Sequence, residues 1–296
     1  MIAYLILAHR YPHQFKRLFR SIYRPDNYYL VHVDKNSGVG LQTEIQYFLS
    51  SFSNASLLKS ESVLWGGYSI VDAELRGIEE LLRMGLKWEF FINLSGQDFP
   101  LQSQTFIQAF LSRNKGKDFL KVANQRTFRP ETLSRIENYV TEPGANLLSP
   151  PIRKRPYLPG VTPYIGNQWV ILTRKCCEFL SYNPEVERFR RFYRHTFIPD
   201  EGFFQTVIMN TSYKGAIVND DKRTIDWVPQ GTIKLRPRVF TFQDADFLMA
   251  SPDLFARKFD ESVDAEILSI LESKLFRDSC YPPTATVRIL PTFQEL

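Results

Sequence analysis

The sequence predicts an α/β fold in which helices flank a mostly parallel central sheet. Over roughly the first 122 residues, short apolar runs alternate with segments of helical periodicity, as βαβ units require. Polar residues follow three of the apolar runs, where strands of such a sheet end. The 296 residues are 44% hydrophobic and 14% aromatic, which is enough for one large domain with a substantial core.

The elements of the first half follow one another in strict alternation. Helical spacing is clearest just after the first run, where Phe15, Leu18, Phe19 and Ile22 recur on one face. The strand-like runs are residues 3–9, 28–34 and 89–100. The helix-like segments are residues 12–23, 42–52, a segment that begins at Ser69 with Asp72 as its capping-box partner, and 103–114.

The second half is less regular. Periodicity is lost from about residue 125 to 165, a proline-rich stretch that is typical of a binding loop or lid. Pro252, after a possible Ser251 cap, predicts a helix start, and another helix is expected over about 261–275. The other expected elements are strands at 167–173, 214–219 and 224–228 and helices at 174–181 and 199–210.

Composition argues against several classes of protein. The net charge of +5 is spread along the chain without a long Lys/Arg run, so a nucleic-acid partner is not expected. Three cysteines cannot form a paired framework, which favours a reducing compartment. The opening "MIAYLILAH" is too short to span a bilayer and lacks the flanks of a signal peptide, so we expect a cytoplasmic protein without its own anchor.

The common catalytic signatures are absent from the sequence. It contains no Gly-rich dinucleotide fingerprint, no P-loop, no HExxH and no GxSxG. Its four histidines have no ligand spacing that would predict zinc. Asp220 and Asp221 could hold Mg²⁺ or Mn²⁺, but adjacent acids in a polar loop are more often simply solvated.

Polar residues at three predicted strand ends indicate one crevice. These residues are His9 and Arg10, Asp34 and Lys35, and Gln97 and Asp98. For Asp34, an Asx-type cap of the following turn and a functional role are about equally supported.

Two further stretches leave a structural and a functional interpretation open. Trp65, Gly66 and Gly67 would let the backbone approach a ligand beside an indole, although a tight turn explains the glycines equally well. Asp200 and Glu201 lie in the expected first turn of a helix, where the macrodipole favours carboxylates. A carboxylate at the mouth of a cleft could equally act as a general base.

Six ordered motifs resemble the core-2/I-branching N-acetylglucosaminyltransferase family, which includes peptide-O-xylosyltransferases. The motifs are "YLVHVDKNS", "SVLWGGYSIVDAEL", "FINLSGQDFPL", "YIGNQWVILTR", "IPDEGFFQTVI" and "LFARKFD". They span roughly residues 1–260. The resemblance implies one GT-A-like catalytic domain, with a nucleotide-binding half at 1–122, an acceptor-binding half at 123–260, and a C-terminal helix and tail at 261–296.

The resemblance also implies an inverting transferase that uses a UDP-sugar as co-substrate, without a metal cofactor. "DAD" at 244–246 lies outside the expected position of a metal-binding DxD. GlcNAc is the first expectation for the donor sugar, with xylose or glucuronic acid as alternatives. The expected product is a β linkage to a glycan hydroxyl.

The family's functional residues map onto the matching motifs. Glu201 corresponds to the catalytic base and Lys258 to a diphosphate-binding lysine. Arg238, or Arg236 close to it in register, corresponds to the family's diphosphate-binding arginine.

The remaining site residues follow from the same resemblance. Asp34 corresponds to the residue near the nucleoside, with His9, Trp65 and Gly66 expected beside it. By analogy the sugar and acceptor sites are bordered by Gln97, Asp98 and Trp169.

The absence of an anchor and of paired cysteines favours a bacterial-type enzyme that acts on a surface polysaccharide or lipid-linked glycan. The basic segment Arg153, Lys154 and Arg155 would then meet an anionic acceptor or the inner face of the membrane. Three rivals stay open: a metal-dependent transferase, a carbohydrate-binding protein without turnover, and a glycoside hydrolase with two carboxylates.

Overall fold

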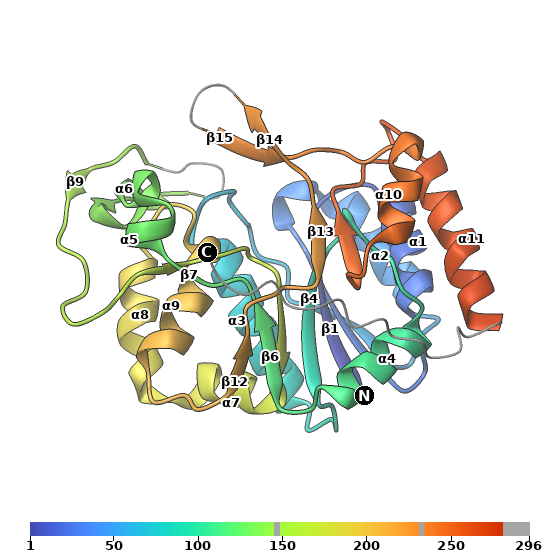
Figure 1. Ribbon diagram of the computed structural model, residues 1–296, viewed down its shortest axis with the longest axis horizontal. Coiled ribbons are helices and arrows are strands. Elements are labelled where there is room, and N and C mark those ends of the chain that lie inside the picture. The colour runs from blue at the N-terminus through green and yellow to red at the C-terminus, as the bar shows by residue number, and fades with distance from the viewer. Residues whose placement is uncertain (145–148, 231–233, 281–296) are drawn as a thin grey trace, which may run out of the picture.

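A seven-stranded sheet forms the centre of the molecule, as the computed structural model of residues 1–144, 149–230 and 234–280 shows (Figure 1). The strand order is β12-β6-β11-β4-β1-β2-β3, and β11 alone runs antiparallel to its neighbours. The α/β prediction with a mostly parallel sheet is therefore confirmed. The strands are β1 (Ile2–Ala8), β2 (Tyr28–Val33), β3 (Ala55–Leu58), β4 (Phe90–Ser95), β6 (Lys117–Leu120), β11 (Val170–Thr173) and β12 (Ala216–Val218).

Helices cover both faces of this sheet (Figure 1). One core packs β1 and β4 against α1, α2, α4 and α11, and the other packs them against α3, α7, α8 and α9. The longer helices are α1 (Pro12–Ile22), α2 (Val39–Leu49), α3 (Ser69–Arg83), α4 (Gln104–Arg113), α7 (Arg174–Tyr182), α8 (Glu187–Tyr193), α9 (Phe203–Asn210), α10 (Ala245–Ala250) and α11 (Glu266–Cys280). No helix in these described ranges is both long and apolar enough to cross a membrane.

Side-chain periodicity explains why the first elements form. Along β1, Tyr4 and Ile6 enter one core and Leu5 enters the other, because successive strand residues face opposite sides of a sheet. The apolar stripe predicted for α1 is fully buried, with Phe15, Leu18, Phe19 and Ile22 all 0% exposed.

The helix α3 begins at Ser69, as predicted, but without the expected serine cap. Ser69 lies inside α3, whose N-cap is Tyr68, and its hydroxyl accepts the Leu64 N–H. Asp72 pairs with Arg76 on the same helix. The expected capping box is therefore wrong, because the serine hydroxyl stabilises the preceding turn instead.

A second, three-stranded sheet corrects another prediction. Its order is β13 (Arg223–Ile225), β16 (Phe255–Arg257) and β5 (Asp98–Pro100). The helix expected to start at Ser251 and Pro252 is wrong, because residues 255–257 form the middle strand of this sheet. Pairing on both sides with distant segments outweighs the local helix signal.

The segment from 125 to 165 consists of short pieces, in keeping with its lost periodicity. They are β7 (Ala123–Asn124), α5 (Gln125–Phe128), α6 (Ser134–Glu137), β8 (Asn138–Tyr139), β9 (Arg153–Lys154) and β10 (Tyr164–Ile165). The hairpin of β14 (Trp227–Gln230) and β15 (Lys234–Pro237) extends away from the central sheet (Figure 1). Local sequence patterns did not predict β3, β6, α8 or α10.

Candidate active site

The carboxyl ends of β1, β2 and β4 meet at one edge of the central sheet. In the parallel ladder, the last residues of β1 pair with the last residues of β2 and β4. His9, Asp34 and Gln97 follow these ends within two residues. The structure therefore gathers the polar strand ends at one edge, where parallel α/β sheets bind ligands.

Asp34 has a structural role at this edge. Its Oδ1 accepts the backbone N–H of Asn36 at 2.9 Å and that of Val63 at 3.0 Å. The first bond caps the turn Lys35–Ser37, and the second fixes the loop that leads to Trp65. The Asx-type cap is thus present, and the contact of Asp34 with a nucleoside stays a prediction.

Three cations gather beside these strand ends from segments far apart in the sequence. Arg10 follows β1, Arg257 ends β16, and Lys258 comes next. Lys258 interacts electrostatically with Arg10 and Arg257, and His9 interacts with all three. Within the described residues, neither Lys258 nor Arg10 has a carboxylate at ion-pair distance.

Burial, followed by repulsion within this group, lowers the pKa values of His9 and Lys258. Desolvation of the His9 imidazole by the surrounding protein, followed by the charges of Arg10 and Lys258, lowers its pKa to about 4. Burial, followed by the charges of Arg10 and Arg257, lowers the pKa of Lys258. An anion bound here would offset this repulsion, so the site suits phosphate groups.

Buried residues hold two of these cations, Arg10 and Arg257, in place. The Arg257 guanidinium carbon lies 4.0 Å from the Trp169 ring centroid, and its Nε lies 3.5 Å from Asp98 Oδ1. Gln97 Oε1 accepts a 3.0 Å hydrogen bond from Arg10. Gln97, Asp98 and Trp169 are all under 4% exposed, so their position favours orienting the cations. Their contact with a sugar or acceptor stays a prediction.

Glu201 ends a single 3₁₀ turn, η4 (Pro199–Glu201), which precedes α9. The expectation that it belongs to the first turn of that helix is wrong, because Gly202 separates the turn from α9. Its Oε2 accepts a 2.6 Å hydrogen bond from Arg135, and both side chains are about a fifth exposed, at 20% and 19%.

Asp200 differs from Glu201 in its surroundings. It is 8% exposed, and burial together with the charge of Glu201 raises the pKa of Asp200 to about 7. Arg257 interacts electrostatically with Asp200 as well as with Asp98. The turn that carries Glu201 is therefore within electrostatic reach of the cation group.

The Trp65–Gly67 loop borders the Glu201 turn. Gly66 has φ of +76°, and its carbonyl accepts the Ile198 N–H at 2.8 Å. A Cβ on Gly66 would lie 2.7 Å from the Phe197 ring, so both the backbone and the contact require glycine here. The Trp65 ring meets Phe197 edge to face at 5.9 Å and is 61% exposed.

The backbone of Arg238 is hydrogen-bonded to Lys258, whereas its side chain binds two carboxylates. Its carbonyl accepts the Lys258 N–H at 3.4 Å. Its guanidinium donates to Asp226 at 2.7 Å and to both oxygens of Asp244 at 2.8 and 2.9 Å. Arg236 is exposed on β15. A diphosphate role for either arginine stays a prediction.

The acids that could hold a metal ion are bound to protein groups. Asp220 pairs with Lys222 at 2.6 Å, and Asp221 accepts a 2.5 Å hydrogen bond from Asn167. Throughout residues 1–144, 149–230 and 234–280, no three His, Cys, Asp or Glu side chains are grouped as metal ligands. Metal independence stays a prediction.

Sequence reasoning missed Arg135 and Arg257. Arg257 adjoins Lys258 in "LFARKFD", and this pair of adjacent cations was an available signal. Arg135 lies in the aperiodic stretch and pairs with a residue 66 positions away. No local pattern marks such a contact.

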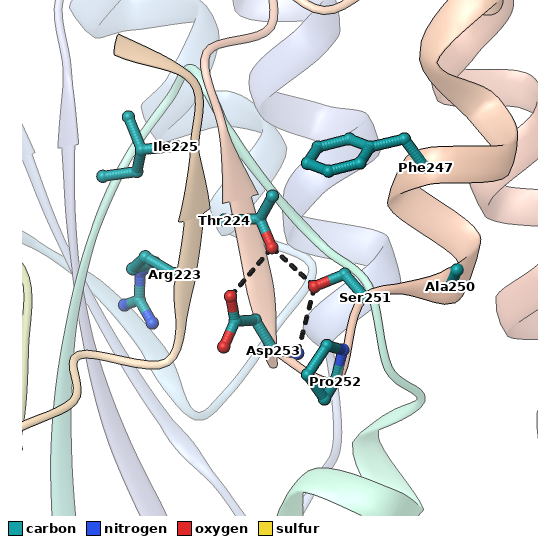
Figure 2. Close-up of a pocket in the computed structure, with 8 residues that line it drawn as sticks. All are labelled: Arg223, Thr224, Ile225, Phe247, Ala250, Ser251, Pro252 and Asp253. Carbon is teal, nitrogen blue, oxygen red and sulfur yellow. Dashed lines mark hydrogen bonds between the residues drawn. The ribbon is translucent and has the colours of Figure 1, made fainter. Parts of the chain in front are cut away.

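A groove of about 500 Å³ lies between β13 and α10, apart from the cation group (Figure 2). Thr224 Oγ1 lies 2.6 Å from Ser251 Oγ and donates to Asp253 Oδ2 at 2.9 Å. Ser251 Oγ also accepts the Asp253 N–H at 3.2 Å. These bonds stabilise the 251–253 turn, so local structure accounts for the polar atoms of the groove.

The basic segment at 153–155 is only partly a surface feature. Arg155 donates to the carbonyls of Ile136 and Phe192 and to Thr196 Oγ1, at 3.1, 3.0 and 2.6 Å. It therefore anchors the β8–β9 hairpin, while Arg153 and Lys154 are exposed.

A family model and individual curated relatives both match most of this chain in sequence. The sequence model of the Core-2/I-branching enzyme family matches residues 2–247. Xylosyltransferase 2 of Mus musculus is 32% identical over 304 residues, covering 96% of this chain and 34% of the relative. Xylosyltransferase of Ciona intestinalis is 31% identical over 301 residues, covering 95% and 35%. The chain thus spans about a third of the length of these curated relatives.

Solved structures are more distant. The crystal structure of S. aureus TarS 1-349 is 14% identical, covers 74% of this chain and 58% of that chain, and has a TM-score of 0.38. Mouse xyloside xylosyltransferase 1 in its apo form is 12% identical, covers 71% and 82%, and has a TM-score of 0.36. These likenesses are too weak to support an argument.

Proposed function

This chain belongs to the Core-2/I-branching enzyme family, and on that premise we propose that it is a glycosyltransferase with a UDP-sugar donor. One observation carries the proposal. Lys258, a cation without a carboxylate partner in the described chain, and the turn that bears Glu201 both lie within electrostatic reach of Arg257. A site for an anionic leaving group beside an accessible carboxylate suits transfer from a nucleotide sugar.

The proposed reaction is a single displacement with Glu201 as general base. Glu201 takes the proton of an acceptor hydroxyl while that oxygen forms a bond to the anomeric carbon of the donor. The bond from this carbon to the UDP oxygen breaks, and its electron pair leaves with UDP. Attack from the opposite face inverts an α-linked donor to a β product.

The leaving diphosphate would be stabilised by protein cations, so the proposed reaction requires no metal ion. We assign this role to Lys258 and Arg238, as the sequence predicts. We add Arg10 and Arg257 to this assignment, because both lie within electrostatic reach of Lys258.

The other predicted residues belong to the same proposal. His9, Asp34, Trp65 and Gly66 would form the nucleotide side of the cleft, where Asp34 already fixes the loop before Trp65. On the sugar and acceptor side are Gln97, Asp98 and Trp169, which would act by holding Arg10 and Arg257.

Three donor sugars are candidates, since glucuronic acid stays an alternative to GlcNAc and xylose. GlcNAc is the donor expected from the sequence motifs, whereas the names of the curated relatives favour xylose. In each case the acceptor would be a glycan hydroxyl, in a surface polysaccharide or glycolipid. Contact with a membrane surface would use Arg153 and Lys154, and unchanged vesicle binding after both are neutralised would contradict it.

The test is UDP release from a panel of UDP-sugars in the presence of EDTA, for the wild type and Glu201→Gln. We expect one sugar to turn over despite chelation and the variant to lose about a hundredfold or more of this activity. That result would also identify the donor.

Two other outcomes would overturn parts of the proposal. Turnover that requires Mn²⁺ or Mg²⁺ would contradict the metal-free mechanism and the cation assignment. Binding of UDP without turnover of any donor, even with a library of glycan acceptors, would instead indicate a carbohydrate-binding relative.

A further inference from the structure

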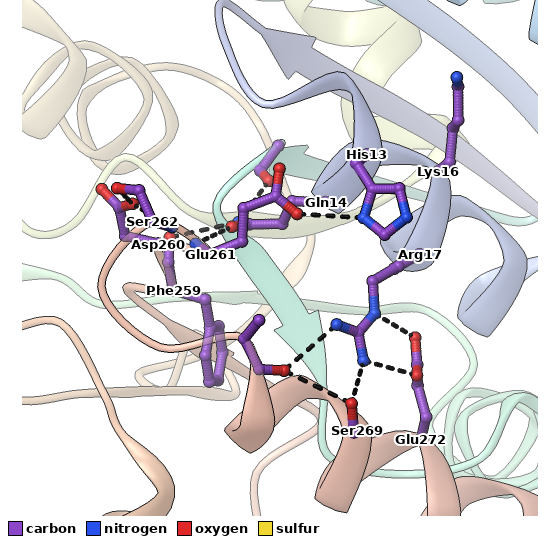
Figure 3. Close-up of polar contacts among 12 residues, drawn as sticks. His13, Gln14, Lys16, Arg17, Phe259, Asp260, Glu261, Ser262, Ser269 and Glu272 are labelled. Carbon is purple, nitrogen blue, oxygen red and sulfur yellow. Dashed lines mark hydrogen bonds and ion pairs between the residues drawn. The ribbon is translucent and has the colours of Figure 1, made fainter.

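Gln14 is a fully buried polar residue beside the cation group. It lies in the first turn of α1, four residues after Arg10, and is 0% exposed. Figure 3 shows its side chain pointing away from α1 toward the turn formed by Phe259, Asp260, Glu261 and Ser262. That turn directly follows Lys258.

The amide of Gln14 joins three separate segments. Its Nε2 donates to the Gly96 carbonyl at 2.9 Å and to the Phe259 carbonyl at 3.2 Å. Its Oε1 accepts the Glu261 N–H at 2.8 Å. Both N–H groups and the oxygen of one side chain are therefore used, in a place without water access.

Neighbouring bonds strengthen the same junction. Gln97 donates from Nε2 to the Phe259 carbonyl at 3.1 Å, and its own carbonyl accepts the Phe259 N–H at 2.9 Å. Tyr11 Oη donates to Asp260 Oδ2 at 2.9 Å. The segments so joined carry Arg10, Gln97 and Lys258.

We propose that Gln14 is a positioning residue that sets the spacing between Arg10 and Lys258 for the diphosphate of the nucleotide. This inference rests on the proposed function of the site. Arg10 and Lys258 repel each other in the absence of an anion, so their loops need a fixed connection to stay close. A buried amide with all its hydrogen bonds made supplies a rigid connection, because breaking any of them would leave a buried polar group unsatisfied.

The test is Gln14→Met, which keeps the length and helix propensity of the side chain and removes all three hydrogen bonds. UDP and uridine affinities are measured by titration calorimetry, with uridine in competition where its binding is weak. We expect UDP affinity to fall about tenfold and uridine affinity to change less than about twofold, because small displacements of positioned groups are costly. The donor KM should rise and kcat should fall, because the same cations stabilise the leaving diphosphate.

Gln104→Met is the matched control. Gln104 is also a buried glutamine, at 7% exposure, and it accepts hydrogen bonds from Tyr4 and Asn27 at the other end of the strands. Its loss should lower the melting temperature without changing the ratio of UDP to uridine affinity. Equal losses of UDP and uridine affinity in Gln14→Met would mean that Gln14 is an ordinary structural residue, and the inference would be wrong.

Tyr11→Phe decides the question if Gln14→Met does not fold. It removes one hydroxyl from the same junction without opening the core, and it should reduce UDP affinity selectively by about threefold. Unchanged UDP affinity would then overturn the inference. A wild type that binds no UDP would contradict the proposed function itself, which separates the two failures.

Discussion

The two sides of the candidate active site differ in whether their charged side chains have a partner of opposite charge. On the proposed nucleotide side, Lys258 is partly buried and has no carboxylate at ion-pair distance among the residues that the structure describes, although the more distant Asp260 and Asp98 attract it. On the proposed acceptor side, Glu201 is paired with Arg135 at 2.6 Å. An unpaired cation in a partly buried place is unfavourable, and this is the physical basis for the proposed anionic ligand. As the proposed base, Glu201 would instead have to give up or share Arg135 when an acceptor hydroxyl binds.

Glu201→Gln should have the largest effect and would break the acceptor side of this comparison. Loss of the base is expected to lower kcat by about a hundredfold or more, while UDP affinity stays within about twofold. Stopped-flow or steady-state UDP release and calorimetry measure the two quantities separately. Glu187→Gln, on the exposed side of α8, is the control. A small loss of kcat would mean that another group takes the proton.

Lys258→Met tests the nucleotide side. Removing a charge-assisted contact to the diphosphate should weaken UDP binding by about ten- to a hundredfold and reduce its salt dependence. Uridine affinity should be unchanged. The matched control is Lys222→Met, because Lys222 already pairs with Asp220 at 2.6 Å. If both variants bind UDP equally well, the absence of a partner at Lys258 has no functional meaning.

Arg238→Met should have a smaller effect, which sharpens the comparison between free and engaged cations. Asp226 and Asp244 hold the Arg238 guanidinium and raise its pKa, so binding a diphosphate would require exchange of these partners. We expect about a threefold loss of UDP affinity by calorimetry. Arg236→Met distinguishes the two candidate arginines. A tenfold larger loss in Arg238→Met would show that nucleotide binding releases it from its carboxylates.

Glu74→Gln should leave turnover nearly unchanged and alter stability instead. Glu74 on α3 accepts hydrogen bonds from Asn93 and Gln168 at 2.7 and 3.0 Å, and burial raises its pKa from 4.5 to about 8. Between these two pKa values, Glu74 keeps its proton in the folded state and loses it in the unfolded state. The free energy of unfolding of the wild type therefore falls as pH rises from 4.5 to about 8. The neutral amide introduced by the substitution does not titrate, so this pH dependence is absent from the variant.

The measurement is the melting temperature of wild type and variant at several pH values between about 5 and about 9. The melting temperature of the variant relative to that of the wild type should rise with pH, and the difference should become constant above about pH 8. A constant difference would show that Glu74 titrates alike in the folded and unfolded states.

The sequence by itself determined the features that depend on local periodicity and short motifs. The stripe of α1, the strands β1, β2 and β4, and the meeting of His9, Asp34 and Gln97 at one edge follow from spacings of 2 and 3.6 residues and from the rules of parallel sheets. Motifs identified the family. They also singled out Glu201 and Lys258, whose roles are still predictions.

Tertiary structure decided what depends on segments that are distant in the chain. Residues 255–257 carry a helix signal but form β16, because β13 and β5 pair with them on both sides. Arg135 meets Glu201, and Gln14 joins Gly96 to Phe259 and Glu261, across long sequence separations. The physical reason is that such contacts follow from how whole elements pack. The spacing of residues along the chain does not predict which distant groups come into contact when the elements pack.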